Sequence, residues 1–221
     1  MAETDNRLKG FFITGSDTAV GKTWISCQII KQLKIKSTSL KVRKPVESGC
    51  NISSDNLLIP ADGEALFKAN DNKESLQQVT PLRFKASTSP DRAARIENQS
   101  ITLDQLQHAV SSNIQPEDTL LVEGAGGFYS PIAEDALNAD LAKLLGLEVF
   151  IVIEDRLGAI NQSLLTIKAV ESEGLTIKAV ILNRTNESQA DDLDNITALR
   201  KRIELPVYSC SYNGELERLN L

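Results

Sequence analysis

The stretch GSDTAVGKT, residues 15–23, constrains the fold of this chain more than any other feature. The apolar run FFIT precedes it and the helix-period segment KTWISCQIIKQLK overlaps its end, so it connects a strand to a helix. Glycine-rich turns in this position are typical of phosphate-binding loops, where backbone N–H groups and the helix N-terminus converge on an anion. The spacing is irregular, because the usual pattern would place its first glycine at Ser16. The surrounding strand and helix nevertheless favour a phosphate-binding loop over a chance Gly-Lys-Thr.

The rest of the chain alternates apolar, β-branched runs with helix-period segments. Several runs are apolar on both faces, as buried parallel strands are. The alternation predicts an α/β fold, a three-layer, doubly wound, mostly parallel sheet with ligands at the carboxyl ends of its strands. We expect one domain over residues 1–221, with mixed loop at residues 47–60 and 70–100. The expected strands after FFIT lie at residues 40–42, 119–127, 148–155, 178–183 and 205–210.

Charge and composition exclude several classes of protein. The net charge is −6 and no Lys/Arg stripe is present, so a nucleic-acid partner is not expected. No apolar run approaches the roughly 20 residues that span a bilayer, and MAETDNRLKG at the N-terminus lacks an apolar leader core. These features predict a cytoplasmic protein without a membrane partner. The three cysteines are far apart and are interpreted as reduced thiols, and His108 as a helix-surface residue.

The phosphate-binding loop indicates the ligand. Lys22 would bring a point charge to the phosphates and Thr23 a hydroxyl to Mg²⁺, so a nucleoside triphosphate with Mg²⁺ is the expected ligand. Neighbouring residues of the loop and of the first helical turn are expected to contact the same nucleotide. They are Ala19, Val20, Gly21 and Trp24.

Two further strand ends carry charged side chains. Glu123 follows the apolar run LLV and precedes a glycine-rich turn that begins Gly124, Ala125, Gly126, where the backbone can approach a ligand closely. An unpaired carboxylate there would be costly, which favours a metal-binding role. Lys44 precedes Pro45 at the point where another strand must stop, so it would project over the same edge. A solvated lysine is the alternative for Lys44.

Four segments, GSDTAVGKT, KPVESG, VEGAGG and RLGAINQSLLT, together resemble the dethiobiotin synthetase family. The family's loop also carries an extra residue, which accounts for the irregular spacing. The resemblance covers most of the chain and implies a P-loop NTPase-like fold and a ligase of biotin biosynthesis. In that reaction 7,8-diaminononanoate and CO₂ (or bicarbonate) give a carbamate, ATP phosphorylates it in the presence of Mg²⁺, and the neighbouring amine closes the ring of dethiobiotin. Such chemistry needs positioning and charge neutralisation more than a dedicated base.

The resemblance also implies roles for individual residues. Lys22, Lys44 and Thr18 would be catalytic, and Ser48 would bind the diamine or the carbamate. Thr23, Asp62 and Glu123 would hold Mg²⁺, with Asp55 close enough in sequence to Asp62 to compete for that role. The substrate carboxylate would bind at Gly158, Ala159, Ile160 and Asn161, across the interface of a homodimer.

Nucleotide contacts implied near the C-terminus are less regular. Asn183 fits the family's adenine-reading asparagine, with a strand-end turn as its alternative, and Arg184 follows it. The family's proline-containing turn is not recognisable in YSCSYNGEL, where Tyr212, Asn213 and Gly214 are placed near the base. Two other departures are Ala19, at a loop position that is often acidic, and Asp91, where the family has histidine.

Two other functions remain open from the sequence. A regulatory ATPase switch of the partition or division-site type would share the fold and the loop. Such switches typically carry a further lysine early in the loop, where this chain has Gly15 and Ser16, and often a membrane-binding tail, whereas this chain ends YNGELERLNL. A cobyrinate-type synthetase would bring a glutaminase domain, for which the chain has no room.

Overall fold

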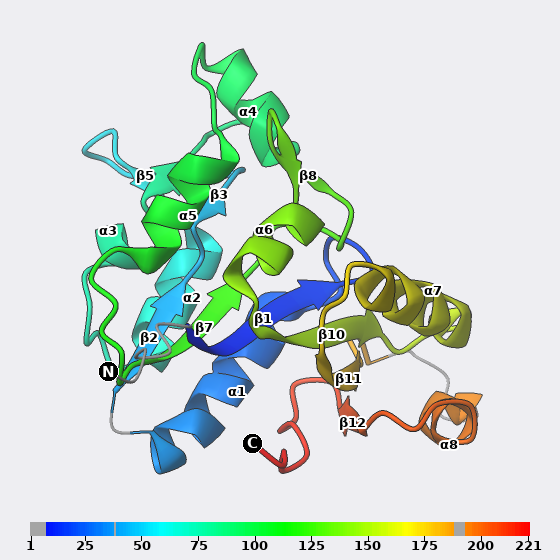
Figure 1. Cartoon of the computed structure of the whole chain (residues 1–221). Helices are drawn as coiled ribbons and strands as arrows, with labels where there is room; N and C mark the ends of the chain where they lie inside the picture. The colour runs from blue at the N-terminus through cyan, green and yellow to red at the C-terminus, as the bar shows by residue number, and fades with distance from the viewer. Residues whose placement is uncertain (1–7, 38, 188–192) are drawn as a thin grey trace, which may run out of the picture.

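The computed structural model describes residues 8–37, 39–187 and 193–221 (Figure 1). Its centre is a six-stranded sheet in the order β12-β11-β10-β1-β7-β2, with every neighbouring pair parallel. The chain starts in the middle of the sheet and builds outward in both directions, which is a doubly wound topology. The six strands are β1 (Lys9–Gly15), β2 (Leu40–Arg43), β7 (Thr119–Glu123), β10 (Glu148–Glu154), β11 (Ile177–Asn183) and β12 (Val207–Cys210).

Helices cover both faces of this sheet. Alternate residues of a strand point to opposite faces, and in β1 Phe12 packs into one apolar cluster whereas Phe11 and Ile13 pack into the other. The Phe11 face is covered by α1 (Lys22–Lys36), α2 (Ala61–Ala69) and α3 (Leu76–Val79). The Phe12 face is covered by α4 (Pro90–Ile96), α5 (Leu103–Ser111), α6 (Asn138–Leu145), α7 (Ala159–Ser172) and α8 (Asn195–Arg200). The predicted three-layer α/β fold is confirmed.

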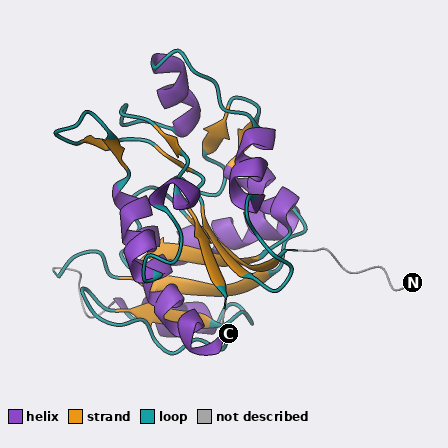
Figure 2. Ribbon diagram, turned by 90° about the vertical axis from the view of Figure 1, so that its left-hand side faces the viewer, coloured by secondary structure: helices purple, strands orange, loops and turns teal. Residues whose placement is uncertain are grey.

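Short elements form a second region near the carboxyl end of β2, above the main sheet in Figure 2. The expectation of mixed loop at residues 47–60 and 70–100 was wrong where α3, α4 and short strands lie. These elements were missed because they are too short for a periodic pattern, although Ser75 supplies a capping box for α3 and Pro90 the first residue of α4. The strand pairs are β3 (Val46–Glu47) with β6 (Leu82–Arg83), β4 (Asn51–Ile52) with β5 (Leu58–Ile59), and β8 (Pro131–Ala133) with β9 (Ala136–Leu137).

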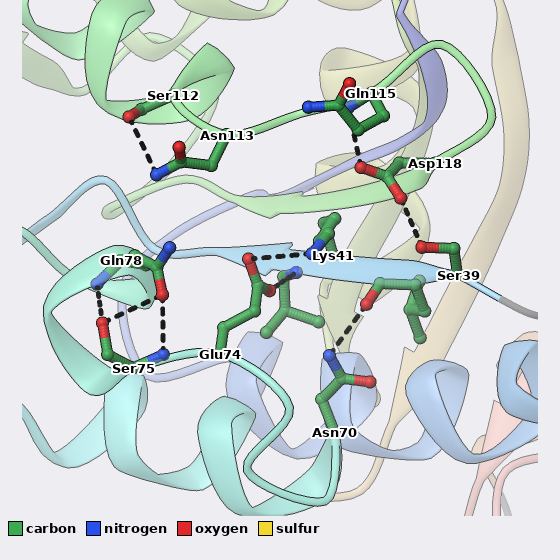
Figure 3. Close-up of polar contacts among 12 residues, drawn as sticks. Ser39, Lys41, Asn70, Glu74, Ser75, Gln78, Ser112, Asn113, Gln115 and Asp118 are labelled. Atoms are coloured by element: carbon green, nitrogen blue, oxygen red, sulfur yellow. Dashed lines mark hydrogen bonds and ion pairs between the residues drawn. The ribbon is translucent and has the colours of Figure 1, made fainter.

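The edge strand β2 is fixed by side chains instead of by a further strand (Figure 3). Asn70 donates to the carbonyl of Leu40 at 3.0 Å, and Glu74 accepts the N–H of Val42 at 3.1 Å. These contacts satisfy backbone groups that an open sheet edge would leave unpaired. Beyond the strand, the N–H of Lys44 donates to the carbonyl of Val79 at 2.8 Å. The backbone that carries Lys44 is therefore held in place.

Other expectations can be compared with the described residues. His108 lies exposed on α5, and the three cysteines are free thiols, as expected. In the part of the chain that the structure describes, every helix is too short or too polar to cross a bilayer. The N-terminal residues 1–7, on which the expectation of no leader partly rests, lie outside the described residues.

Candidate active site

The loop after β1 wraps tightly before α1 begins. Ala19 has a φ of 61° and Gly21 a φ of 85°, both in the left-handed region, which glycine adopts without steric cost. A Cβ at Gly21 would lie 2.1 Å from Nδ2 of Asn183, so only glycine fits this close approach. Nζ of Lys22 donates to the carbonyl of Asp17 at 2.8 Å, so the side chain folds back over the loop.

Glu123 is the centre of a buried polar cluster at the carboxyl ends of β1, β2 and β7. The register pairs Arg43 with Val122, so Lys44 and Glu123 emerge side by side. One carboxylate oxygen, Oε1, accepts hydrogen bonds from Lys44 Nζ at 2.7 Å and from Thr23 Oγ1 at 2.8 Å. The other, Oε2, accepts from Ser26 Oγ at 2.6 Å, and Glu123 itself is only 1% exposed. The cluster therefore joins α1 to both strand ends.

Lys44 is held by more than one acceptor. Its ammonium lies 3.1 Å from Oδ2 of Asp62 and 3.1 Å from the carbonyl of Gly124, in addition to the contact with Glu123. Lys44 is 3% exposed, which is inconsistent with the alternative of a solvated lysine. Asp62, on the first turn of α2, is thereby brought to the cluster, whereas Asp55 is exposed in the turn between β4 and β5. The geometry favours Asp62 over Asp55 as the acidic partner.

The two lysines differ in their electrostatic environment. Burial, aided by repulsion from Lys44, lowers the pKa of Lys22 to about 8. Burial also opposes the charge of Lys44, but Glu123 and Asp62 outweigh it and raise the pKa of that lysine above its ordinary value. The pKa of Asp62 is lowered because the hydrogen bonds and charge of Lys44 outweigh its burial. Lys44 is a fully charged ammonium between two carboxylates.

The glycine-rich turn after β7 depends on one buried amide. Asn138, at the start of α6, accepts from the N–H of Ala125 at 2.9 Å and donates to the carbonyl of Ala125 at 2.6 Å. It also donates to the carbonyls of Gly127 at 3.2 Å and Ser130 at 3.1 Å. Sequence reasoning missed Asn138, because nothing in the pattern of α6 indicates that its first residue holds a turn thirteen positions earlier.

A cavity of about 660 Å³ opens over this cluster. Its wall includes most of the residues expected at the phosphates and the substrate, and several that sequence reasoning missed. The missed residues come from the Ser-Pro segment before α4, from the segment after the glycine-rich turn, and from Glu47. The dipeptide Ser89-Pro90 could have indicated the first of these, because it marks the start of a helix. The predicted lining residues are Thr18, Ala19, Gly21, Lys22, Thr23, Lys44, Ser48, Asp62, Ala125 and Gly126. The missed ones are Glu47, Ser87, Thr88, Ser89, Pro90, Ser130 and Pro131.

Asn183 lies on the other side of the loop, at the end of β11. It is 2% exposed, and its Nδ2 donates to the carbonyl of Val20 at 2.9 Å. Its Oδ1 is buried and has no hydrogen-bond partner among the residues that the structure describes, which is costly unless a ligand donates to it. Arg184 follows, with Nε 3.7 Å from Oδ2 of Asp155. Asn183 is the last residue of β11, and its contact with a base stays a prediction.

Of the predicted residues, Val20, Glu123, Gly124, Asn183 and Arg184 do not line the cavity, and neither do three further segments. Gly158 caps α7 with a φ of 92°, and Ala159, Ile160 and Asn161 form the first turn of that helix. The next residue of α7, Gln162, contacts the loop: its Oε1 accepts a long hydrogen bond of 3.5 Å from Ser16 Oγ. The other segments are Trp24, which is 42% exposed on α1, and the turn of Tyr212, Asn213 and Gly214 after β12, in which the N–H of Gly214 donates to the carbonyl of Ser211 at 2.9 Å. Their ligand contacts stay predictions.

The donor set fits Mg²⁺ and a nucleotide. The carboxylates of Glu123 and Asp62 meet the hydroxyl of Thr23 near the start of α1. Mg²⁺ in nucleotide sites takes one or two carboxylates beside the phosphates. The unpartnered Oδ1 of Asn183 can accept from a base. These features define the protein as a nucleotide-binding enzyme of the P-loop type.

Comparisons with known proteins identify the family. A family model described as an AAA domain matches residues 9–212. The ATP-dependent dethiobiotin synthetase of Ruthia magnifica is 38% identical over 215 residues, covering 96% of both chains. That of Phenylobacterium zucineum is 35% identical and covers 94% of this chain and 90% of its own. The chain therefore belongs to the ATP-dependent dethiobiotin synthetase family, within the AAA domain family.

The signal recognition particle receptor FtsY of Elizabethkingia anophelis has a TM-score of 0.49 and 15% identity. The match covers 94% of this chain and 59% of that chain.

Proposed function

We propose that this chain, acting as one domain, converts 7,8-diaminononanoate, CO₂ and ATP into dethiobiotin, ADP and phosphate. The observation that carries the proposal is the position of Lys44, whose ammonium lies 2.7 Å from Glu123 and 3.1 Å from Asp62. This arrangement stands beside the phosphate-binding loop in a chain of the dethiobiotin synthetase family. It brings positive charge to the place where a nucleotide's terminal phosphate would meet a small substrate.

The first steps form and activate a carbamate. A neutral amine of the substrate attacks CO₂, a C–N bond forms, and the amine proton leaves to solvent. A carbamate oxygen then attacks the γ-phosphorus of ATP, and the bond from that phosphorus to ADP breaks. Lys22 and Lys44 stabilise the negative charge on the transferring group, because preorganised ammonium groups act strongly in a buried site. Thr18 and Ser48, both lining the cavity, orient the carbamate by hydrogen bonds.

The last step closes the ring. The second amine attacks the carbamate carbon and a second C–N bond forms. The C–O bond to phosphate breaks, phosphate leaves with the electron pair, and the amine proton passes to the phosphate or to solvent. This step needs the neighbouring amine held close to the activated carbon, which is a matter of positioning. Ser48 Oγ is itself oriented, since it donates to the carbonyl of Thr88 at 2.5 Å.

Thr23, Asp62 and Glu123 would hold Mg²⁺. When bound, the ion supplies neutralisation of charge on the β- and γ-phosphates. Ala19, Val20 and Gly21 would offer backbone N–H groups to the phosphates, and the glycine-rich turn of residues 124–126 would lie against them. On the far side of the loop, Asn183 and Arg184 would contact the base, as would Trp24 and the turn of residues 212–214.

We also propose that the protein acts in the cytoplasm as a homodimer. The start of α7, Gly158 and residues 159–161, does not line the cavity of its own chain, and the positive end of a helix dipole favours a carboxylate there. A second copy would bring this turn to the tail of the diamine. A regulatory ATPase switch is less well supported, because relatives at 38% identity over nearly the whole chain are named as synthetases.

Product analysis tests the function directly. Purified protein with ATP, Mg²⁺, ¹³C-bicarbonate and diaminononanoate should yield dethiobiotin that carries the label, detected by mass spectrometry. Phosphate release should require every component. Phosphate released without the diamine, with no labelled product in the complete mixture, would refute the proposal and favour the switch.

A further inference from the structure

Glu47 is a buried carboxylate beside the cluster to which none of the steps above assigns a role. It lies at the end of β3, is 6% exposed and lines the cavity next to Ser48. Both of its oxygens are used: Oε1 accepts the N–H of Asp62 at 3.0 Å, and Oε2 accepts the N–H of Gly63 at 2.9 Å. The acceptor and the donors are fifteen and sixteen positions apart in the chain.

These bonds replace an ordinary helix cap. The residue before α2 is Pro60, whose side chain makes no capping hydrogen bond. The first hydrogen bond within the helix runs from the N–H of Glu64 to the carbonyl of Pro60 at 2.8 Å, so earlier N–H groups need other acceptors. Glu47 supplies two of them from a different segment, and it adds a negative charge at the positive end of the helix dipole.

The first turn of α2 is also fixed from its other side. A Cβ at Gly63 would lie 2.2 Å from Oγ1 of Thr80, so the turn packs closely against the end of α3. Glu47 and Thr80 together leave the backbone of Asp62 little freedom to shift. The carboxylate that projects from this backbone is the one that lies 3.1 Å from Nζ of Lys44.

A capping role alone does not account for the location of this charge. A neutral serine or threonine at the residue before the helix would cap it equally well. Here a third carboxylate is buried beside two others, where mutual repulsion makes its charge costly. What distinguishes Glu47 from an ordinary cap is that one of its two hydrogen bonds holds the backbone N–H of Asp62 itself.

We propose that Glu47 is a positioning residue, which holds the backbone of Asp62 so that the Asp62 carboxylate is in position to bind Mg²⁺. The inference rests on the proposed function only in giving Asp62 a metal-binding role. Residues that orient metal ligands typically change metal affinity 10–100-fold when they are replaced. Glu47 acts here through backbone N–H groups instead of through the side chain of the ligand.

Metal binding measured without turnover tests the proposal. Mn²⁺ would be titrated into protein with saturating ADP and followed by electron paramagnetic resonance, for wild type, Glu47→Gln, Glu47→Asp and Asp62→Asn. Glu64→Gln is the matched control, because it also removes one negative charge near the start of α2, and among the described residues its ion pair is with Lys68, at 2.8 Å. Urea unfolding and ADP binding without metal would be measured for each variant.

We expect Glu47→Gln to weaken Mn²⁺ binding by about 10-fold or more, because the amide places an oxygen opposite one backbone N–H but an NH₂ donor opposite the other. Binding of ADP alone should be unchanged, Asp62→Asn should be at least as weak, and Glu64→Gln should match wild type. If Glu47→Gln does not fold, Glu47→Asp serves, since the shortened side chain keeps the charge but cannot reach both donors.

The outcomes separate the two proposals. If Asp62→Asn weakens Mn²⁺ binding and folded Glu47→Gln does not, Glu47 is only a helix cap and the inference is overturned. If Asp62→Asn has no effect, the metal role of Asp62 in the proposed function fails, and this inference fails with it. Formation of labelled dethiobiotin by wild type is read independently of both.

Discussion

Replacing Glu74 with alanine should destabilise the protein more than any surface change, because it leaves a buried arginine without its carboxylate partner. Arg43, the last residue of β2, has a fully buried side chain, and its Nη1 lies 2.7 Å from Oε1 of Glu74, which is itself 3% exposed. The remaining partners of the guanidinium are the backbone carbonyls of Val42 at 2.8 Å and Ser112 at 2.9 Å. Glu74 also accepts the N–H of Val42 on β2 at 3.1 Å. Its contact with Lys41, 4.0 Å from Nζ to Oε1, is drawn in Figure 3.

The magnitude follows from what the substitution leaves behind. A hydrogen bond to a charged group is worth about 1.5–3 kcal/mol, and an unsatisfied buried N–H costs about 1–3 kcal/mol. Breaking a buried ion pair from one side costs about 3–5 kcal/mol in measured cases, in the same range. With a urea m-value of about 3 kcal/mol/M for a chain of this size, the midpoint should fall by about 1–1.7 M.

Urea unfolding followed by far-UV circular dichroism measures the effect. Replacing both partners, Arg43→Met with Glu74→Leu, should recover much of the loss, because no charge is then left buried alone. The N–H of Val42 still loses its acceptor, so a deficit of about 1–3 kcal/mol should remain. Glu171→Ala is the control, since its pair with Lys168 is 47% and 81% exposed and should be worth less than about 1 kcal/mol. A loss below about 1 kcal/mol for Glu74→Ala, or a double variant as unstable as the single one, would refute the reasoning.

Three further predictions concern the site and the thiols. Lys44→Gln should leave ADP binding intact by calorimetry but abolish dethiobiotin in the mass spectrum, because the charge acts on the transferring group; full activity would contradict the assignment. Gly21→Ala should lower the free energy of unfolding by more than about 1 kcal/mol and weaken ADP binding, because the φ of 85° is strained for alanine and its Cβ would strike Asn183. If Gly21→Ala had the stability and the ADP affinity of wild type, the loop would have to rearrange to accept the added Cβ, and the reasoning would be wrong. Burial raises the pKa of Cys27 to about 12 and that of Cys50 to about 11, so both stay protonated at pH 8 and should react with DTNB far more slowly in native than in unfolded protein. Rapid labelling of either thiol in the native protein would overturn this.

The sequence could predict the edge where the site lies because strand order and strand ends carry simple signals. A lysine before Pro45 and a carboxylate before a glycine-rich turn both mark points where a buried strand stops. In a parallel sheet these points share one edge, and the register brings Lys44 beside Glu123 because β2 and β7 are neighbours. The irregular loop could also be interpreted as a phosphate-binding loop, because the strand β1 before it and the helix α1 after it were both recognisable in the sequence.

Contacts between side chains and distant backbone groups could not be predicted in this way. Glu47 lies within KPVESG, yet its role depends on the N–H groups of a helix that starts fourteen residues later, at Ala61. Asn138 likewise serves carbonyls of a turn earlier in the chain. Hydrophobic periodicity indicates which face of an element is buried, but it carries no information on which backbone group a buried polar side chain meets. Such residues become visible only when the elements are in place.

The unequal surroundings of the two lysines explain how similar side chains can divide the work. In the described part of the chain no carboxylate forms an ion pair with Lys22, whose ammonium is bonded to a loop carbonyl and whose pKa is lowered by burial. An arriving phosphate gives Lys22 the counter-charge that it lacks, so nucleotide binding is where that lysine gains most. Lys44 already has Glu123 and Asp62, and an additional anion brings it little by itself. The ammonium of Lys44 contributes most when negative charge accumulates on the transferring phosphoryl group. Loss of Lys44 should therefore slow the chemical step more than it weakens nucleotide binding.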